Sequence, residues 1–294
     1  MKNKVLTGLL LVLIGGWGSL SAQSAGSNYS RQVNTLIGTK GVGLTSGYLY
    51  PGATYPYGMV QFTPSYFSKR SGFVINQLSG GGCEHMGNFP TFPVKGKLKM
   101  SPDNILNYRI NISEEKGHAG YYEAMVQEDI KAKLTVTERT GMASYEYPAD
   151  QQYGTVIIGG GISATPIEQA AIVITAPNKC EGYAEGGNFC GLRTPYKVYF
   201  VAEFDTDALE SGTWKRNELK PNTTFAEGEY SGVYFTFDVN KKKNIQYKIG
   251  VSYVSVENAR ENLKAENTGW DFLQIQNQAE SKWNHYLGKI EVEG

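Results

Sequence analysis

The chain has 294 residues, no formal net charge at neutral pH, and an abundance of glycine (35) and tyrosine (20). This balance argues against a nucleic-acid-binding function, because the lysine triplet Lys241 to Lys243 is more simply explained as a solvated turn between strands. Many turns and many tyrosines are typical of an all-β extracytoplasmic protein.

Residues 1–22 predict a secretory signal peptide. Two lysines precede an apolar run from Val5 to Leu13, and small residues follow up to Ala22. The run is shorter than the ~20 residues of a membrane-spanning helix, and no later segment has that length. We therefore expect export to the periplasm or the extracellular space, with no membrane span. The alternative is a buried N-terminal helix.

Residues 23–254 predict a large antiparallel β-sandwich, so the expected fold class is mainly β. Apolar and polar residues alternate in DIKAKLTVTERTGMASYEYP, KVYFVAEFD, GVYFTFDV and IQYKIGVSYVS, each bounded by turn-forming residues. The first of these predicts a hairpin with its break at Gly141, and TVIIGGGIS predicts a buried strand that runs into a glycine turn. The stretch before residue 100 has few regular periods and predicts long loops over one end of a sheet.

The cysteines allow two interpretations. An exported chain can form disulfides, and CEGYAEGGNFC suggests a hairpin with Glu-Gly-Gly at its tip. Cys180 and Cys190 could then be bridged across that hairpin. Two unpaired thiols are the competing interpretation. Cys83 is left without a partner in both.

Residues 255–294 predict two helices. SVENARENLKAE begins with a serine at a plausible N-cap position. WDFLQIQNQAESKWNHYLGKI has apolar residues at spacings of three and four, the pattern of an amphipathic helix: Phe272, Ile275, Ala279, Trp283 and Tyr286. If the faces that carry Trp270 and Trp283 are exposed, a further domain is expected to cover them.

The candidate functional segment is NQLSGGGCEHMGNFP, residues 76–90. It is neither a dinucleotide fingerprint nor a P-loop. Cys83 and His85 are too closely spaced for a good nucleophile and base, and with Glu84 they lack the paired spacing of a metal site. Glycines that expose the backbone, beside forked polar side chains and aromatic rings, suit a hydroxyl-rich sugar. The alternative is an ordinary tight loop.

Three segments in order, VNTLIGTKG (33–41), PGATYPYGMVQFTP (51–64) and LSGGGCEHMGNFP (78–90), resemble the opening of glycoside hydrolase family 92, the calcium-dependent exo-α-mannosidases. The hairpin around GHAGYY and the passage from VSYVS to the last residue resemble later parts of the same family. Three departures leave the linkage preference open: Leu36 at an aromatic position, a short segment between Met59 and Phe73, and Asn76-Gln77 in place of a Thr-His pair.

The resemblance implies a β-sandwich joined by helices to a C-terminal (α/α)6 barrel. In the family that barrel carries the general acid, the general base and the calcium ligands, and no positions of this chain match them. We therefore assign no catalytic and no metal-ligating residue, place Ca²⁺ in the catalytic domain that is absent from this chain, and expect the chain alone to be inactive. Residues 23–254 would be the carbohydrate-contacting sandwich, and residues 255–294 a helical linker toward that domain.

The resemblance also implies a role for the loop. Gly82 and Cys83 would contact or line the pocket of the terminal mannose, with Gln77, Glu84 and His85 nearby. The implied partners are mannose-containing glycans and the catalytic domain, with no nucleic acid. The implied function is that of the N-terminal domain of a secreted, inverting exo-α-mannosidase acting on mannose-rich glycans. The alternative is a free-standing carbohydrate-binding sandwich without enzymatic activity.

Overall fold

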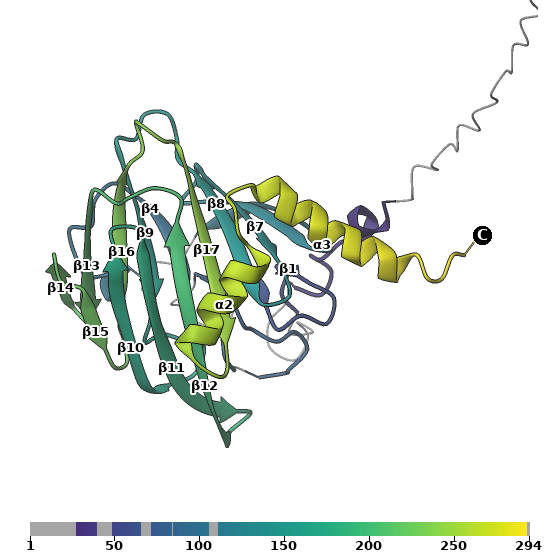
Figure 1. Ribbon diagram of the computed structural model, residues 1–294, viewed down its shortest axis with the longest axis horizontal. Helices are drawn as coiled ribbons and strands as arrows, with labels where there is room; N and C mark the ends of the chain where they lie inside the picture. The colour runs from purple at the N-terminus through teal and green to yellow at the C-terminus, as the bar shows by residue number, and fades with distance from the viewer. Residues whose placement is uncertain (1–27, 40–48, 66–71, 84, 106–110, 293–294) are drawn as a thin grey trace, which may run out of the picture.

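The computed structural model describes residues 28–39, 49–65, 72–83, 85–105 and 111–292. The predicted signal peptide, residues 1–22, lies outside them. Within these ranges the chain forms two antiparallel sheets that face each other as a sandwich (Figure 1). The predicted fold class, a mainly β sandwich followed by two C-terminal helices, is therefore confirmed.

The first sheet has eight strands among the described residues, in the order β1-β2-β3-β4-β9-β16-β13-β14. Their bounds are Ala53–Thr54 (β1), Gln61–Pro64 (β2), Phe73–Val74 (β3), Thr91–Lys95 (β4), Tyr153–Gly159 (β9), Ser231–Asp238 (β16), Glu210–Lys215 (β13) and Glu218–Pro221 (β14). The short strands β1 to β3 at one edge correspond to the stretch in which the sequence predicts loops.

The second sheet has nine strands in the described ranges, in the order β15-β10-β11-β12-β17-β8-β7-β6-β5. Their bounds are Phe225–Glu227 (β15), Ile167–Ala176 (β10), Lys179–Phe189 (β11), Leu192–Phe204 (β12), Asn244–Ser252 (β17), Thr140–Glu146 (β8), Ile130–Val136 (β7), Tyr121–Val126 (β6) and Ile112–His118 (β5). The helices are η1 (Tyr29–Gln32), α1 (Pro102–Ile105), α2 (Val256–Glu266) and α3 (Phe272–Leu287).

Aromatic side chains fill the space between the two sheets. The ring of Phe204 on β12 lies 5.0 Å from the rings of Phe235 and Phe237 on β16 in the opposite sheet. Phe73 on β3 stacks on Tyr145 of β8, with ring centroids 6.2 Å apart. Burial of such a side chain contributes about 1.5–3 kcal/mol each, so this aromatic layer is a main source of stability.

The hairpin predicted around Gly141 is present, with one shift. DIKAKLTVTERTGMASYEYP forms β7 and β8, but the turn lies at residues 137–139 and Gly141 is inside β8. A Cβ at Gly141 would lie 2.6 Å from Cδ1 of Ile75, so the glycine serves the packing of the two sheets rather than the turn. TVIIGGGIS forms β9, which ends at Gly159 before a turn, as predicted.

Neither interpretation of Cys180 and Cys190 is correct: they are not bonded to each other, and of the two only Cys180 is a free thiol. CEGYAEGGNFC is not a hairpin, because β11 (Lys179–Phe189) runs through it as one strand and ends just before Cys190. Cys180 and Cys190 are therefore roughly 30 Å apart, at about 3.3 Å per residue. The glycines fit this strand because they allow close approach: a Cβ at Gly182 would collide with the carbonyl of Ala171. Cys190, at the turn into β12, instead bonds Cys83, and Cys180 is a buried free thiol.

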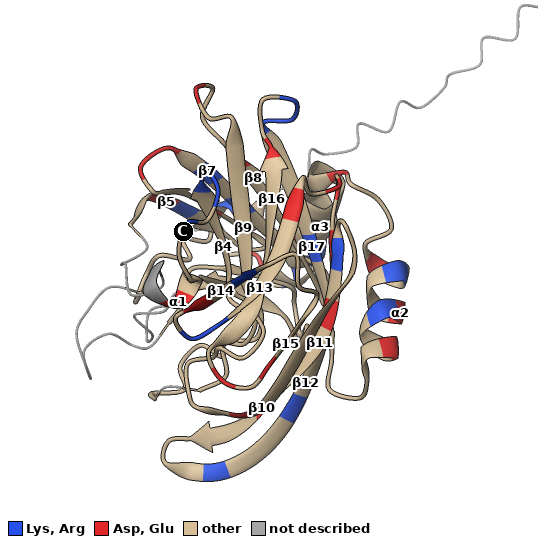
Figure 2. Ribbon diagram, turned by 90° about the vertical axis from the view of Figure 1, so that its left-hand side faces the viewer, with Lys and Arg blue, Asp and Glu red and all other residues tan. Residues whose placement is uncertain are grey.

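Both C-terminal helices form and cover the outer face of the nine-stranded sheet (Figure 1). The Ser255 hydroxyl caps α2 by accepting a hydrogen bond from the backbone N–H of Asn258 (3.1 Å), as predicted. α2 approaches the sheet closely at Gly250, where a Cβ would lie 2.5 Å from the carbonyl oxygen of Ala259. Figure 2 shows acidic and basic residues interspersed along α2, so neither sign dominates its outer side.

α3 binds the first described element of the chain. The buried Glu280 carboxylate accepts a hydrogen bond from Nε of Arg31 (3.2 Å) and lies 3.6 Å from Nε2 of His118. The backbone N–H of Ser30 donates to Oδ1 of Asn284 (2.7 Å). Because they pair a buried carboxylate, these contacts fix α3 to η1 and to β5.

Both tryptophans of the C-terminal segment pack against the sandwich. Trp283 Nε1 donates to the carbonyl of Thr54 (2.7 Å), and Nζ of Lys248 lies 4.3 Å from the ring centroid of Trp270. Burial lowers the pKa of Lys248, although Glu203 opposes that shift. Both tryptophans therefore have partners within the chain, and their packing does not require a further domain.

Candidate functional site

Two asparagines close the base of the loop of residues 76–90. Nδ2 of Asn76 donates to Oδ1 of Asn88 (2.9 Å), and the backbone N–H of Asn88 donates back to Oδ1 of Asn76 (2.8 Å). The Tyr196 hydroxyl donates to the same Asn88 oxygen (2.9 Å), and the Tyr253 hydroxyl lies 3.4 Å from Nδ2 of Asn76. Burial raises the pKa of Tyr196 to about 12, so this phenol stays a donor at neutral pH.

The tip of the loop exposes its backbone. Gly80 and Gly82 have φ angles of +76° and +73°, a region that favours glycine, and a Cβ at either position would meet nothing. The Cys83–Cys190 disulfide ties this tip to the turn between β11 and β12. Since the Cys83 sulfur is bonded to Cys190, it is no free nucleophile. The loop is therefore an exposed backbone surface held in place by a covalent link.

His85 lies beneath the tip rather than on it. It is 1% exposed, and its ring stacks on Phe189 with centroids 5.1 Å apart and planes 20° apart. A Cβ at Gly81 would collide with this ring, so the glycine is needed for the ring to pack there. Burial lowers the pKa of His85, while backbone groups of His85 and Leu78 oppose the shift, so the ring is neutral at neutral pH.

Several buried polar atoms of the loop have no hydrogen-bond partner of ordinary geometry. They are both amide atoms of Gln77, both ring nitrogens of His85 and Nδ2 of Asn88. Buried polar atoms in folded proteins are nearly always paired, so a concentration of unpaired ones is unusual and demands a structural or functional reason. It indicates a place where water or a polar ligand completes the structure.

The residues predicted to form the sugar pocket are thus divided between two layers. Gly82 is exposed and Cys83 is half-buried at the tip, whereas Gln77 and His85 are buried below it. Glu84 lies outside the described residues. The sequence pattern missed three aromatic residues that reach the loop: Phe189 from β11, Tyr196 from β12, and Tyr253 from just after β17. Nothing in the spacing of the sequence links them to a loop more than 100 residues away.

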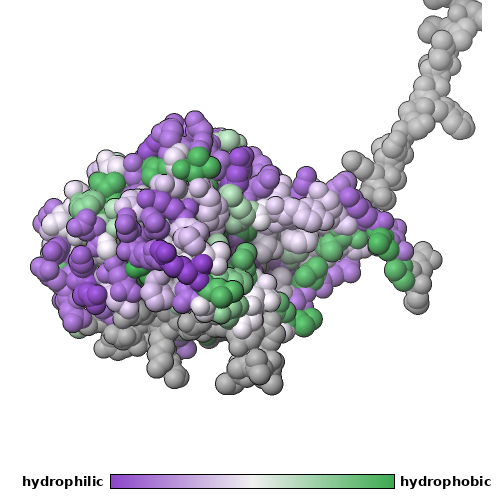
Figure 3. Space-filling model, turned by 90° about the horizontal axis from the view of Figure 1, so that it is seen from below, coloured by the Kyte–Doolittle hydropathy of each residue, from purple (hydrophilic) through white to green (hydrophobic). Residues whose placement is uncertain are grey.

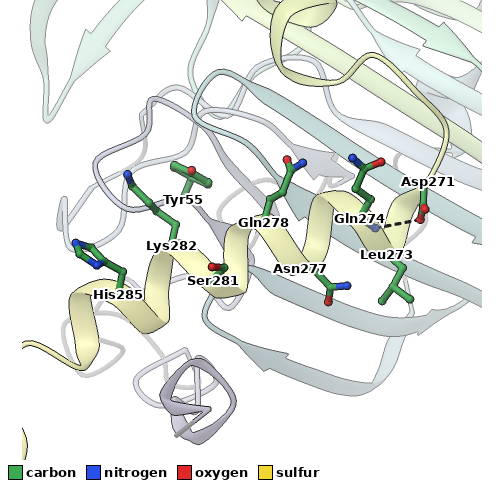
Figure 4. Close-up of a pocket in the computed structure, with 9 residues that line it drawn as sticks. All are labelled: Tyr55, Asp271, Leu273, Gln274, Asn277, Gln278, Ser281, Lys282 and His285. Atoms are coloured by element: carbon green, nitrogen blue, oxygen red, sulfur yellow. Dashed lines mark hydrogen bonds between the residues drawn. The ribbon is translucent and has the colours of Figure 1, made fainter. Parts of the chain in front are cut away.

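A second concave surface runs along α3. It is an open groove of about 810 Å³ whose lining comes mostly from one side of the helix, with Tyr55 opposite (Figure 4). No polar atom that lines it is buried and unpaired, so the groove lacks the unsatisfied groups found in the loop. Apolar side chains are exposed nearby, at Leu273 (58%) and Ile290 (80%), and Figure 3 shows apolar residues gathered on the part of the molecule that extends beyond the sandwich.

Neither a metal centre nor a membrane helix is found in the part of the chain that the structure describes. Within these ranges, no three His, Cys, Asp or Glu side chains come together in a way that could hold an ion. The described helices are also too short or too polar to cross a bilayer. The described residues therefore show no cluster of carboxylates suited to Ca²⁺.

Lowering the pH should weaken the fold through His85. The folded chain holds the imidazole proton less tightly than the unfolded chain, because burial lowers the pKa below 6.5. At pH values between the lowered pKa and 6.5, the unfolded state therefore binds more protons than the folded state. The contribution of His85 to the unfolding free energy is thus fully present above pH 6.5 and decreases as the pH falls through that range. We expect the unfolding free energy from urea titrations to be smaller at about pH 5.5 than at about pH 7.5.

His85→Phe keeps a ring against Phe189 and should remove this part of the pH dependence. His285→Gln is the matched control, because it removes an exposed imidazole on α3 and leaves His85 in place. If His85→Phe shows the same loss of stability on acidification as the unmodified chain, the burial of His85 is not its cause.

The chain matches two protein-family models in succession. Residues 32–252 match the glycosyl hydrolase family 92 N-terminal domain, and residues 258–294 match the glycosyl hydrolase family 92 catalytic domain. An uncharacterized secreted glycosidase of Arthroderma benhamiae is 26% identical over 301 residues, which cover 89% of this chain and 38% of that protein. The chain thus spans less than half the length of this relative.

Solved structures show the same fold. A family GH92 alpha-mannosidase from Bacteroides thetaiotaomicron superposes with a TM-score of 0.77 at 24% identity, over 91% of this chain and 39% of that one. A family GH92 inverting mannosidase from the same species gives a TM-score of 0.72 at 23% identity, over 89% and 36% of the two chains. In both, the sandwich described above corresponds to little more than a third of the solved chain.

Proposed function

Because this chain belongs to glycosyl hydrolase family 92, we propose that it is the N-terminal β-sandwich of a secreted, inverting exo-α-mannosidase that removes terminal mannose from mannose-rich glycans. The family match over residues 32–252 is the observation that carries the proposal. Three relatives support its finer points. One is called a secreted glycosidase, one is an inverting mannosidase, and one alpha-mannosidase was solved with mannoimidazole.

The loop of residues 76–90 is the proposed contribution of this domain to the sugar pocket. Hydroxyl-rich ligands need many short hydrogen bonds, and the exposed backbone of Gly80 to Gly82 can both donate and accept them. The His85 ring lies directly behind that surface, and the unpaired amide of Gln77 lies near Gly87 at the other end of the loop. We assign Gly82 and Cys83 to the pocket wall, and Gln77, Glu84 and His85 to its support.

Residues 255–294 are proposed to lead into the catalytic domain. The catalytic-domain model begins to match at residue 258, two residues into α2. The groove along α3 and the exposed Leu273 offer that domain a mixed polar and apolar surface, as domain interfaces within one chain usually do. Residues 23–254 would then form the carbohydrate-contacting unit and residues 255–294 the connection.

The chemistry assigned to this chain is binding and orientation. Inverting hydrolysis needs one carboxylic acid that protonates the leaving oxygen and one carboxylate that activates water on the opposite face of the sugar. By family resemblance both groups, and the ligands of Ca²⁺, belong to the catalytic domain. The sandwich would hold the terminal mannose and exclude water from its outer side. A competing function is carbohydrate binding without catalysis, which the internal packing of Trp270 and Trp283 favours.

The proposal is tested on the native protein. An antibody raised against this chain isolates the native polypeptide, and mannose release from α-mannobioses is followed by proton NMR, which reports the anomer formed first. We expect release of β-mannose that stops on addition of a chelator and returns with Ca²⁺. The 294-residue chain alone should give no turnover in either condition. Turnover by the chain alone, or no release by the native protein, would contradict the proposal.

A further inference from the structure

A small, partly enclosed pocket lies between the segment that joins β9 to β10 and the turn that joins β15 to β16. Its volume is about 180 Å³, and its polar lining comes from Ser163, Thr165 and Glu229, with Tyr230 and Ile162 as apolar walls. Pockets for drug-sized ligands have roughly 300–1,000 Å³, so this one has room for a single small ring. It is separate from the groove along α3.

The floor of this pocket is preorganised. The backbone N–H of Tyr230 donates to the carbonyl of Gly161 (2.8 Å), and the N–H of Gly161 donates to the carbonyl of Ser231 (2.9 Å). A Cβ at Gly161 would collide with the carbonyl of Gly228, so only glycine allows the two turns to approach this closely. A ligand would therefore meet a surface whose shape is already fixed.

Tyr230, which lines the pocket, and Arg216, which contacts Tyr230 from outside it, both adopt left-handed backbone conformations. The φ angles are +58° at Tyr230 and +50° at Arg216, and the N–H of Arg216 donates to the carbonyl of Tyr230 (2.7 Å). For a bulky side chain such a conformation costs about 1–3 kcal/mol, and strain of this kind concentrates at functional sites. The strained pair places the Arg216 guanidinium over the Tyr230 ring, 4.9 Å from its centroid.

The polar groups of the pocket suit a hydroxylated ligand. The Glu229 carboxylate is 31% exposed and lies 3.9 Å from the Arg216 guanidinium. A carboxylate with free oxygens accepts hydrogen bonds from neighbouring hydroxyls. Thr165 is 9% exposed, and its Oγ1 has no hydrogen-bond partner, so a turn about χ1 would supply a further donor and acceptor.

We propose that this pocket binds one neutral pyranose unit. Its hydroxyls would donate to Glu229 and pair with Thr165, and its apolar face would rest on Tyr230 or Ile162. The carboxylate disfavours an anionic ligand, and the apolar walls disfavour a fully hydrated cation. The volume excludes anything much larger than one sugar ring.

The pocket adjoins the loop of residues 76–90. The N–H of Ala164 donates to the carbonyl of Met86 (2.8 Å), and a Cβ at Gly87 would lie 3.5 Å from that of Ala164. One branched glycan could therefore place one sugar at the loop and another in the pocket. The inference rests on the proposed function only in the choice of mannose as a probe. The shape and polar groups of the pocket do not depend on that function.

The test is a titration of the isotopically labelled chain with methyl α-D-mannopyranoside and, separately, with methyl β-D-glucopyranoside, followed by amide NMR. We expect saturable shifts at the amides of residues 161–167 and 228–231 with at least one probe. Glu229→Gln and Thr165→Val should each raise the dissociation constant at these amides, by about tenfold for the charged group and less for the hydroxyl. Glu227→Gln and Thr224→Val, on exposed neighbours, are the matched controls.

The outcomes separate this inference from the proposed function. Shifts confined to residues 76–90 would overturn the pocket and leave the loop as a sugar contact. Shifts in the pocket without shifts in the loop would support the pocket and speak against that role of the loop. If neither probe moves the pocket amides, or if both pocket variants bind as tightly as the controls, the inference is wrong. Unchanged amide signals elsewhere in each variant show that it is folded.

Discussion

Replacing Cys83 and Cys190 together with serine should lower the free energy of unfolding by about 2–4 kcal/mol, because the link closes a loop of 107 residues in the unfolded chain. The effect should be largest at the loop tip, where Gly80 and Gly82 otherwise leave the backbone free to move. Guanidinium titrations measure the loss of stability, and amide hydrogen exchange at residues 78–83 measures the loosening.

A reductant provides the matched comparison. It should destabilise the unmodified chain to the level of the double variant and leave the double variant unchanged. Cys180→Ala, at the buried free thiol, should retain the full response to reductant. If the unmodified chain and the double variant unfold at the same denaturant concentration, then the link between the loop and the turn after β11 does not stabilise the folded state.

Asn88→Ala should cost about 2–4 kcal/mol of unfolding free energy, since it leaves two donors without their acceptor. Oδ1 of Asn88 accepts from Nδ2 of Asn76 and from the Tyr196 hydroxyl, and both donors are sheltered from solvent. The base of the loop should open, so that amides between residues 76 and 88 exchange faster than those of the neighbouring β4. Denaturant titration and hydrogen exchange of the same samples measure both effects.

Tyr196→Phe is the control for this substitution. It removes one donor and leaves Asn88 paired with Asn76, so we expect a smaller loss of about 0.5–1.5 kcal/mol. A double-mutant cycle between Asn76→Ala and Asn88→Ala should give a coupling energy of about 0.5–3 kcal/mol. An Asn88→Ala variant no less stable than Tyr196→Phe would mean that the asparagine pair does not hold the loop.

Much of the sandwich could be predicted because its signals are local. β7, β8, β12 and β17 have alternating patterns that need only one buried face to be recognised, and Ser255 marks the start of α2 by its position alone. β1 to β3 could not be predicted in the same way. These strands have two to four residues each, too few to show a period, and they join the sheet because β4 offers an edge with which β3 pairs.

The candidate site could be located from the sequence but not built from it. The three consecutive glycines at residues 80–82 indicated the loop, because a run of glycines is unfavourable inside a helix or a strand. The partner of Cys83 was beyond reach, because glycine in CEGYAEGGNFC serves strand packing as readily as a turn. The burial of His85 was equally hidden, since its ring packs on Phe189, which a separate strand brings to the loop.

The contacts of Arg31 and Ser30 with α3 constrain the order in which the chain folds. Arg31 and Glu280 are 249 residues apart in the chain, and Ser30 and Asn284 are 254 apart. Residues 29–32 therefore cannot make these contacts until α3 has been synthesised. Contacts of such separation are slow to form, and the nascent sandwich can close around its aromatic core long before them. Residues 29–32 are therefore among the last of the described residues to reach their native positions.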